Sequence, residues 1–139
     1  MERIVVGVDG SEPSHRALEW AVDEARRRHA VVEAVHAWHQ SFVPNYAYKG
    51  QVHLGEYASE AQKVLDVAIA AVDTAGVTVE GKVVAGTPAQ VLAKAAKGAS
   101  MVVVGSRGRG RVSGLLLGSV SQQTALHAPC PIVIVAAAA

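Results

Sequence analysis

Residues 4–11 read IVVGVDGS, an apolar run that stops at an aspartate, a glycine and a serine. The run predicts a β-strand over residues 4–8, and the three residues after it predict a turn. Beyond the turn, apolar residues recur at helical spacing over residues 17–25. Ser11 can cap that helix, and the arginines of residues 26–28 suit the negative end of its dipole. The chain therefore opens with a strand, a turn and a helix.

The same alternation of strands and helices continues along the chain. Gly76 and Gly98 are stop signals for the second and third helices, and Thr87 with Pro88 begins the third. Valine-rich runs mark the strands, and such runs suit a parallel sheet that is covered on both faces. The later strands are expected over residues 31–38, 77–85, 101–104 and 132–135, and the fourth helix over 119–127. We expect one α/β domain over residues 1–139, with a single doubly wound sheet of five parallel strands.

Composition and charge exclude several classes of protein. Half of the 139 residues are hydrophobic and 18% are charged, which is typical of a globular domain. The formal net charge is only +1, whereas a nucleic-acid binder usually carries a strong basic face. The apolar run near the N-terminus is too short for a signal peptide or a membrane span, and the single cysteine cannot form an internal disulfide. We therefore expect a cytoplasmic protein with no nucleic-acid and no membrane partner.

Ligand chemistry is expected where the strands end, because open parallel sheets bind ligands beyond the carboxyl ends of their strands. The strongest feature there is GSRGRGRVSGLLLGSVS, residues 105–121, between the fourth strand and the fourth helix. Its glycines can adopt positive φ and let backbone approach a ligand, and its arginines can offset phosphate charge. At Gly118 and Ser119, the N–H groups that begin the helix form an anion site. The stretch predicts phosphate binding; the alternative is a flexible surface loop with solvated arginines.

Several other residues near the same edge have two interpretations each. Asp9 can bind a ribose hydroxyl or help to hold Mg²⁺, or it can simply cap the turn into the first helix. His36 and His39 are three residues apart, but no carboxylate or cysteine joins them at zinc-site spacing, so we expect structural roles for both. Trp38 can stack on a base, although core or interface packing is the expected role.

The last strand raises a question of assembly. Residues 132–135 read IVIV, so both faces of this strand are apolar. At the edge of the sheet, such a strand would leave apolar faces and open backbone groups that a second copy of the chain could cover. In the centre of the sheet, it would already be covered. The residues alone leave both positions open.

These motifs together resemble a known family. The spacing G-x2-G-x9-G-S over residues 105–119 matches the G-x2-G-x9-G-(S/T) signature of ATP-binding universal stress proteins. Residues 4–11 resemble that family's first strand and turn, and residues 118–131 resemble its close. The likeness spans nearly the whole chain, in the family's order and spacing. On these residues the chain is identified as a member of the ATP-binding type of universal stress protein.

The resemblance implies a flavodoxin-like sheet, of the adenine nucleotide alpha hydrolase type, with strand order 3-2-1-4-5. It also implies a homodimer that pairs Ile132 to Val135, and ATP as the ligand, alone or with Mg²⁺ at Asp9. Backbone at the end of the second strand would approach adenine, with Val35 better placed than His36 or Ala37. The nucleotide-binding residues that the resemblance implies are Val8, Asp9, Val35, Gly105, Ser106, Arg107, Gly108, Arg109, Gly118, Ser119, Val120 and Ser121.

The implied function is that of a nucleotide-dependent regulator or sensor in the stress response, with slow or no ATP turnover. The sequence contains no G-x-x-x-x-G-K-(S/T) motif, and no residue stands out as a base that would activate water. Two alternatives stay open at this point. One is a slow ATPase or another enzyme that acts on an adenine nucleotide, and the other is a protein-interaction module that binds no nucleotide.

Overall fold

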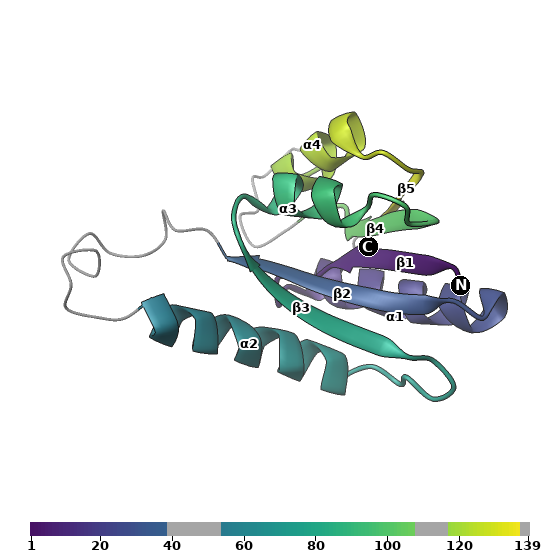
Figure 1. Cartoon of the computed structure of the whole chain (residues 1–139), viewed down its shortest axis with the longest axis horizontal. Helices are drawn as coiled ribbons and strands as arrows, with labels where there is room; N and C mark the ends of the chain where they lie inside the picture. The colour runs from purple at the N-terminus through teal and green to yellow at the C-terminus, as the bar shows by residue number, and fades with distance from the viewer. Residues whose placement is uncertain (39–53, 108–116, 137–139) are drawn as a thin grey trace.

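A computed structural model describes residues 1–38, 54–107 and 117–136 (Figure 1). The predictions for His39, Gly108 and Arg109 lie outside these residues. Strands and helices alternate as the sequence predicts. In chain order the elements are β1 (Arg3–Gly7), α1 (Glu12–Arg28), β2 (Val31–Trp38), α2 (Leu54–Ala70), β3 (Val79–Ala85), α3 (Pro88–Ala95), β4 (Met101–Gly105), α4 (Ser119–His127) and β5 (Ile132–Val135).

The strands form one parallel sheet in the order β3-β2-β1-β4-β5. This order and the five-stranded α/β architecture confirm the fold expected from the sequence. β1 lies in the centre, between β2 and β4, and its register pairs Gly7 with Val35. The chain therefore changes direction across the sheet at β1 and β4, and this change leaves a crevice at the carboxyl ends of the two strands.

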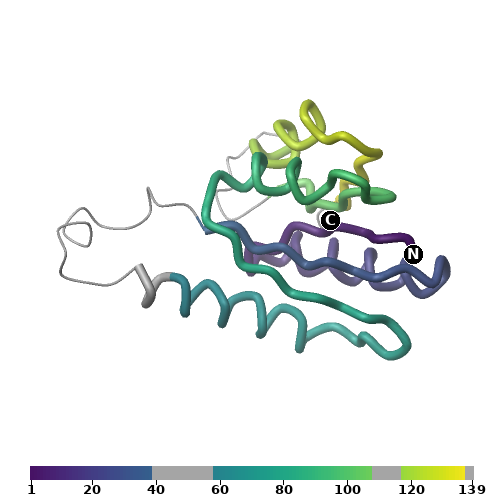
Figure 2. Tube along the Cα trace, viewed as in Figure 1, coloured from purple at the N-terminus to yellow at the C-terminus, as the bar shows by residue number. Residues whose placement is uncertain are grey.

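Helices cover both faces of the sheet. Figures 1 and 2 show α1 and α2 on one side and α3 and α4 on the other. Strand residues alternate between the two layers: Val6 packs in the core with α1, whereas Val5 packs in a second core with α3. Both cores draw on the same strands, which explains why β1 and β4 are apolar at nearly every position.

Several boundaries differ from those expected. β1 lies one residue earlier than predicted, although the Val8 N–H still donates to the Val35 carbonyl at 2.8 Å. β3 begins at Val79, not at residue 77, because the Val77 N–H donates to the Thr74 carbonyl in a turn. The second and third helices end before Gly76 and Gly98, the glycines that the sequence predicts as their stops. Both glycines lie in the following turns with positive φ, at +78° for Gly76 and +75° for Gly98.

β5 forms one edge of the described sheet and pairs with β4 alone. All four of its side chains are half-buried. The structure thus answers one part of the question left by the sequence, because the apolar strand is at the edge.

Cys130, just before β5, packs against the core beside α3, and burial raises the pKa of its thiol. No helix in the described residues is both long and apolar enough to cross a membrane.

Candidate functional site

A cavity of about 400 Å³ opens at the carboxyl ends of β1, β2 and β4, against the start of α4. This volume is within the range of about 300–1,000 Å³ that is usual for small-molecule sites. Its position agrees with the crevice expected from the strand order. The residues that line it are Gly7, Val8, Asp9, Ser14, Val35, His36, Ala37, Trp38, Pro88, Leu92, Val104, Gly105, Arg107, Gly118, Ser119, Val120 and Ser121.

The turn after β1 holds Asp9 in a network of serine contacts. Asp9 Oδ1 accepts a hydrogen bond from the Ser11 N–H at 2.9 Å and another from the Ser11 hydroxyl. The Asp9 N–H donates to Ser14 Oγ at 3.2 Å. Ser11 Oγ also accepts from the Ser14 N–H at 3.3 Å and so caps α1, as the sequence predicts. Asp9 therefore organises the turn and lines the cavity at the same time.

Gly105 ends β4 where α1 begins, and its lack of a side chain has a packing cause. A Cβ added at Gly105 would lie 2.8 Å from the backbone carbon and oxygen of Pro13. Glycine is needed because the strand passes directly under the first turn of α1. The expected positive φ is wrong at this residue and at Gly118, whose φ is −74°. Among the described residues that line the cavity, these glycines permit close packing and an extended cap, not a left-handed turn.

Ser106 joins the end of β4 to the start of α4. The Gly118 N–H donates to the Ser106 carbonyl at 2.6 Å, and the Ser121 hydroxyl donates to the same carbonyl at 3.2 Å. Ser121 is only 2% exposed, and its hydroxyl also contacts the Gly118 carbonyl at 2.9 Å. Ser121 is one of the residues that the family resemblance implies as nucleotide-binding. In the structure, the Ser121 hydroxyl links the end of β4 to the start of α4, while the Ser121 N–H lies in the first turn of α4.

The start of α4 presents backbone donors to the cavity. Gly118 is its N-cap and supplies no side-chain hydrogen bond, and no acidic residue occupies its first turn. The first turn of a helix leaves N–H groups without intrahelical partners, here on Ser119, Val120 and Ser121. Together with the positive end of the helix dipole, they form a site that attracts anions. Arg107 lines the same cavity and adds a positive charge. By contrast, Ser11 caps the start of α1 with its own side chain.

The end of β2 forms an apolar wall of the cavity. Val35, Ala37 and Trp38 line it, together with Leu92 and Pro88 of α3. Trp38 is half-buried here, so it is placed at the cavity and not only in the core. His36 is 8% exposed, and its Nδ1 lies 2.7 Å from the Val8 carbonyl oxygen. Within the described part of the chain, no group of three or more histidine, cysteine, aspartate or glutamate residues could hold a metal ion.

Most of the residues expected to bind a ligand lie together. Val8, Asp9, Val35, Gly105, Arg107 and residues 118–121 all line the cavity, whereas Ser106 supports it from behind. Ser14, Pro88 and Leu92 also line it, and sequence reasoning missed them as site residues; Trp38 lines it too, where the sequence leaves stacking on a base as the alternative to packing. The one signal for Ser14 was its position three residues after the capping serine. Leu92 and Pro88 carried no signal, because the crossing of α3 over β1 and β2 brings them there.

Comparison with known proteins identifies the family. A family model described as the universal stress protein family matches residues 1–136. Universal stress protein Rv2623 of Mycobacterium tuberculosis is 36% identical over 133 residues, which cover 94% of this chain and 44% of the relative. The chain spans about half the length of the first such relatives. Universal stress protein YxiE of Bacillus subtilis is 31% identical over 144 residues, covering 96% of this chain and 97% of that protein.

A solved structure adds to these relatives. The crystal structure of a universal stress protein in complex with cAMP is 28% identical, with a TM-score of 0.65, and the match covers 99% of this chain and 98% of that one. The family match over nearly the whole chain agrees with the strand order and with the place of the cavity. The chain belongs to the universal stress protein family.

Proposed function

We propose that the cavity binds an adenine nucleotide, with ATP as the ligand, and that the chain acts as a nucleotide-dependent regulator or sensor in the stress response. The observation that carries the proposal is the meeting of two surfaces. The open first turn of α4 and Arg107 face the same 400 Å³ cavity as the apolar wall at the end of β2. The first turn of α4 with Arg107 suits a polyphosphate, and the apolar wall suits a base. A related structure with cAMP bound supports this ligand class.

The residues divide into roles by their chemistry. The N–H groups of residues 119–121 and the Arg107 guanidinium would hold phosphate oxygens. The Asp9 carboxylate would accept a hydrogen bond from a ribose hydroxyl or join Mg²⁺, held in place by Ser11. The adenine would lie against the end of β2. The proposal assigns no catalytic residue, so bound ATP would be turned over slowly or not at all. A slow ATPase is the alternative.

The test is titration of the protein with ATP, ADP, AMP and cyclic AMP by calorimetry, with and without Mg²⁺. The variant Ser119→Glu places a carboxylate in the first turn of α4, where Ser119 is exposed. We expect ATP affinity to fall at least about tenfold, because the new charge competes with phosphate for the same N–H groups. The melting temperature should hold or rise, since an acidic residue suits the N-terminus of a helix.

Gln123→Glu is the matched control, because it adds the same charge to an exposed position one turn further along α4. This variant should bind ATP nearly as well as the wild type. Equal losses in both variants would indicate general repulsion and contradict a phosphate site at the first turn. Wild-type protein that binds none of the four nucleotides would refute the proposal and favour an interaction module.

The proposal includes a cytoplasmic homodimer that pairs β5 with β5 of a second copy. The Val102 and Ser106 N–H groups donate to the carbonyls of Pro131 and Val135, so these β5 residues face β4. Ile132 and Ile134 therefore direct their backbone groups outward. Ile134→Pro would remove an outward N–H and yield a monomer in sedimentation, whereas Ile134→Ala, which loses the side chain but keeps that N–H, should remain more dimeric. A proline variant that remains dimeric would contradict a dimer that pairs through β5.

A further inference from the structure

His36 is a buried side chain that the proposed site does not use. It lies in β2 with 8% of its surface exposed, and its Nδ1 is 2.7 Å from the Val8 carbonyl oxygen. A carbonyl oxygen can only accept a hydrogen bond, so Nδ1 carries the hydrogen and donates. The imidazole is thus fixed to the last residue before the Asp9 turn. A histidine held this way, on the wall of a ligand cavity, calls for a functional explanation.

The contact replaces a hydrogen bond between β1 and β2. In a parallel ladder, a residue of one strand donates to one residue of its neighbour and accepts from the residue two further along. The Val8 N–H donates to the Val35 carbonyl at 2.8 Å, so the Val8 carbonyl would next accept from the Ala37 N–H. It accepts from the His36 imidazole instead. The side chain therefore ends the ladder one bond early.

The backbone of Ala37 faces the cavity as a result. Strand residues direct their N–H and C=O groups to alternate sides. Trp38 faces β3, because its carbonyl accepts from the Gly86 N–H at 2.8 Å. Ala37 therefore faces the side of β1, where the last register pair is Gly7 with Val35. Ala37 lies beyond this pair, and it lines the cavity. One donor and one acceptor of the same residue are thus presented to a ligand.

We infer that His36 is a positioning residue for base recognition: by occupying the Val8 carbonyl, it keeps the Ala37 N–H and C=O available to read the edge of the base. This inference rests on the proposed function. A donor beside an acceptor complements adenine, which offers a ring nitrogen that accepts and an amino group that donates. Guanine offers an N–H and a carbonyl in the reverse arrangement. His36 thus contributes to the choice of adenine through the backbone of Ala37.

Three substitutions separate this role from simple packing. His36→Asn keeps an N–H at nearly the place of Nδ1. His36→Gln is the same amide with its N–H displaced by one carbon. His36→Phe keeps a ring of similar size without a donor, so the Val8 carbonyl would take the Ala37 N–H and close the ladder. His127→Phe is the control for loss of an exposed imidazole, in the last turn of α4.

The first measurement is the ratio of ATP affinity to GTP affinity by calorimetry. We expect the wild type and His127→Phe to prefer ATP by at least about tenfold, since a mismatched edge leaves polar groups unpaired. His36→Asn should keep most of that preference, and His36→Phe and His36→Gln should lose most of it. A purely structural role would lower both affinities together. An unchanged ratio in His36→Phe and His36→Gln would overturn the inference, and if the phenylalanine variant fails to fold, the asparagine and glutamine pair decides.

The second measurement is independent of any nucleotide. Amide hydrogen exchange at Ala37, followed by NMR in the free protein, should be fast in the wild type and His36→Asn. It should slow at least about tenfold in His36→Phe, because the amide becomes part of the ladder. Exchange that does not slow would overturn the ladder argument even if ATP binds. Wild-type protein that fails to bind ATP would refute the proposed function and, with it, the role in base recognition, while slowed exchange would still show that His36 ends the ladder.

Discussion

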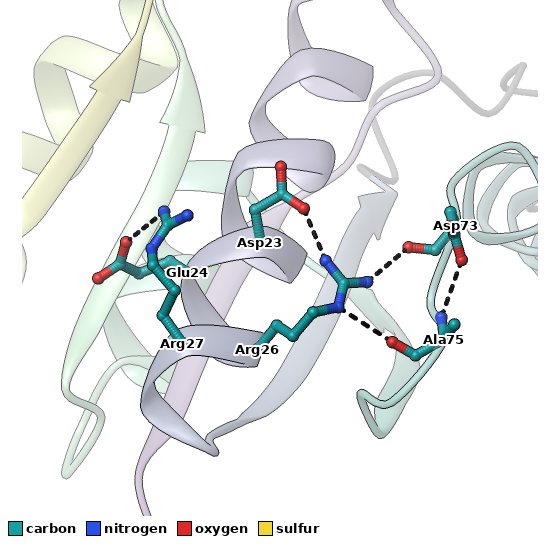
Figure 3. A network of polar contacts seen from close by, with 6 residues as sticks. All are labelled: Asp23, Glu24, Arg26, Arg27, Asp73 and Ala75. Atoms are coloured by element: carbon teal, nitrogen blue, oxygen red, sulfur yellow. Dashed lines mark hydrogen bonds and ion pairs between the residues drawn. The ribbon is translucent and has the colours of Figure 1, made fainter.

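The two ends of the sheet differ in what their backbone groups contact. At the amino end, two arginines bind backbone carbonyls of neighbouring turns. Arg3 donates to the carbonyls of Ala95 and Lys97, each at 2.7 Å, and Arg26 donates to those of Asp73 and Ala75 at 3.2 and 3.0 Å. Figure 3 shows Arg26 reaching from α1 to the turn that follows α2. At the carboxyl end, backbone N–H groups of α4 face a cavity instead.

This difference separates stability from binding. Guanidinium groups hold the turns at the amino end through charge-assisted hydrogen bonds. The carboxyl end can then leave donors available for a ligand. We therefore expect substitutions at the amino end to lower the free energy of unfolding and leave nucleotide affinity nearly unchanged. Substitutions at the carboxyl end should change affinity.

Arg3→Ala should give the largest loss of stability. Glu33 is 5% exposed and lies 3.2 Å from Arg3 Nη1, so its carboxylate would lose a partner while it stays buried. Lys82 Nζ, at 3.4 Å, would remain beside it. We expect the free energy of unfolding in urea to fall by about 2–4 kcal/mol. The free energy of unfolding of Arg3→Lys should lie between those of the wild type and Arg3→Ala. A loss below about 1 kcal/mol in Arg3→Ala would contradict the importance of this contact.

Gly105→Ala tests the carboxyl end, where packing and site meet. The new Cβ would lie 2.8 Å from the Pro13 backbone, so β4 or α1 must shift. We expect a loss of roughly 1–3 kcal/mol in stability, as is usual for overpacking, together with weaker ATP binding in calorimetry. Gly98→Ala is the comparison, because Gly98 has positive φ with open space around it. It should cost stability through backbone strain alone and leave ATP affinity at the wild-type value.

Arg26→Ala should have a smaller effect, because its contacts are exposed. It would remove the two carbonyl contacts and the ion pair with Asp23 at 2.8 Å (Figure 3). We expect a loss of about 1 kcal/mol in urea unfolding. Arg27→Ala removes only an exposed pair with Glu24 at 2.9 Å, and should change stability by less than about 0.5 kcal/mol. Equal effects would show that the carbonyl contacts of Arg26 add nothing.

Acid should produce the smallest effect, at Glu24. Hydrogen bonds from Arg28, and then from Arg27, lower the pKa of this carboxyl below its ordinary value. A carboxyl whose pKa is lower in the folded state stabilises the protein above its unfolded pKa, and that contribution is lost as pH falls through the folded pKa. The small difference in melting temperature between wild type and Glu24→Gln should therefore disappear in acid. A difference that grows as pH falls would contradict the sign.

The sequence predicted the sheet and its strand order well, because the apolar runs and the family motifs both mark the central strands. It was less accurate at the ends of elements. The sequence predicts Gly76 as the stop of the second helix, but the helix ends at Ala70, and Asp73 Oδ1 accepts a hydrogen bond from the Ala75 N–H in the turn before the glycine. Side-chain contacts of this kind compete with helical bonds, and spacing does not reveal them.

The site was predicted only in part, because spacing along the chain reveals some of its contacts and not others. Asp9 and Gly118 stand directly after or before an element, so their position along the chain places them at the cavity. The contact of His36 with the Val8 carbonyl depends on the register between β1 and β2. The packing reason for Gly105 depends on which helix crosses above it, and Pro13 is distant in sequence. Such relations exist only after the chain has folded.

The Ser106 carbonyl has a consequence for how this fold can be varied. It receives the Gly118 N–H and the Ser121 hydroxyl, so the chain leaves β4 and enters α4 at a single shared point. A change at Gly118 or Ser121 would therefore displace the end of the strand and the start of the helix together, because one acceptor holds both.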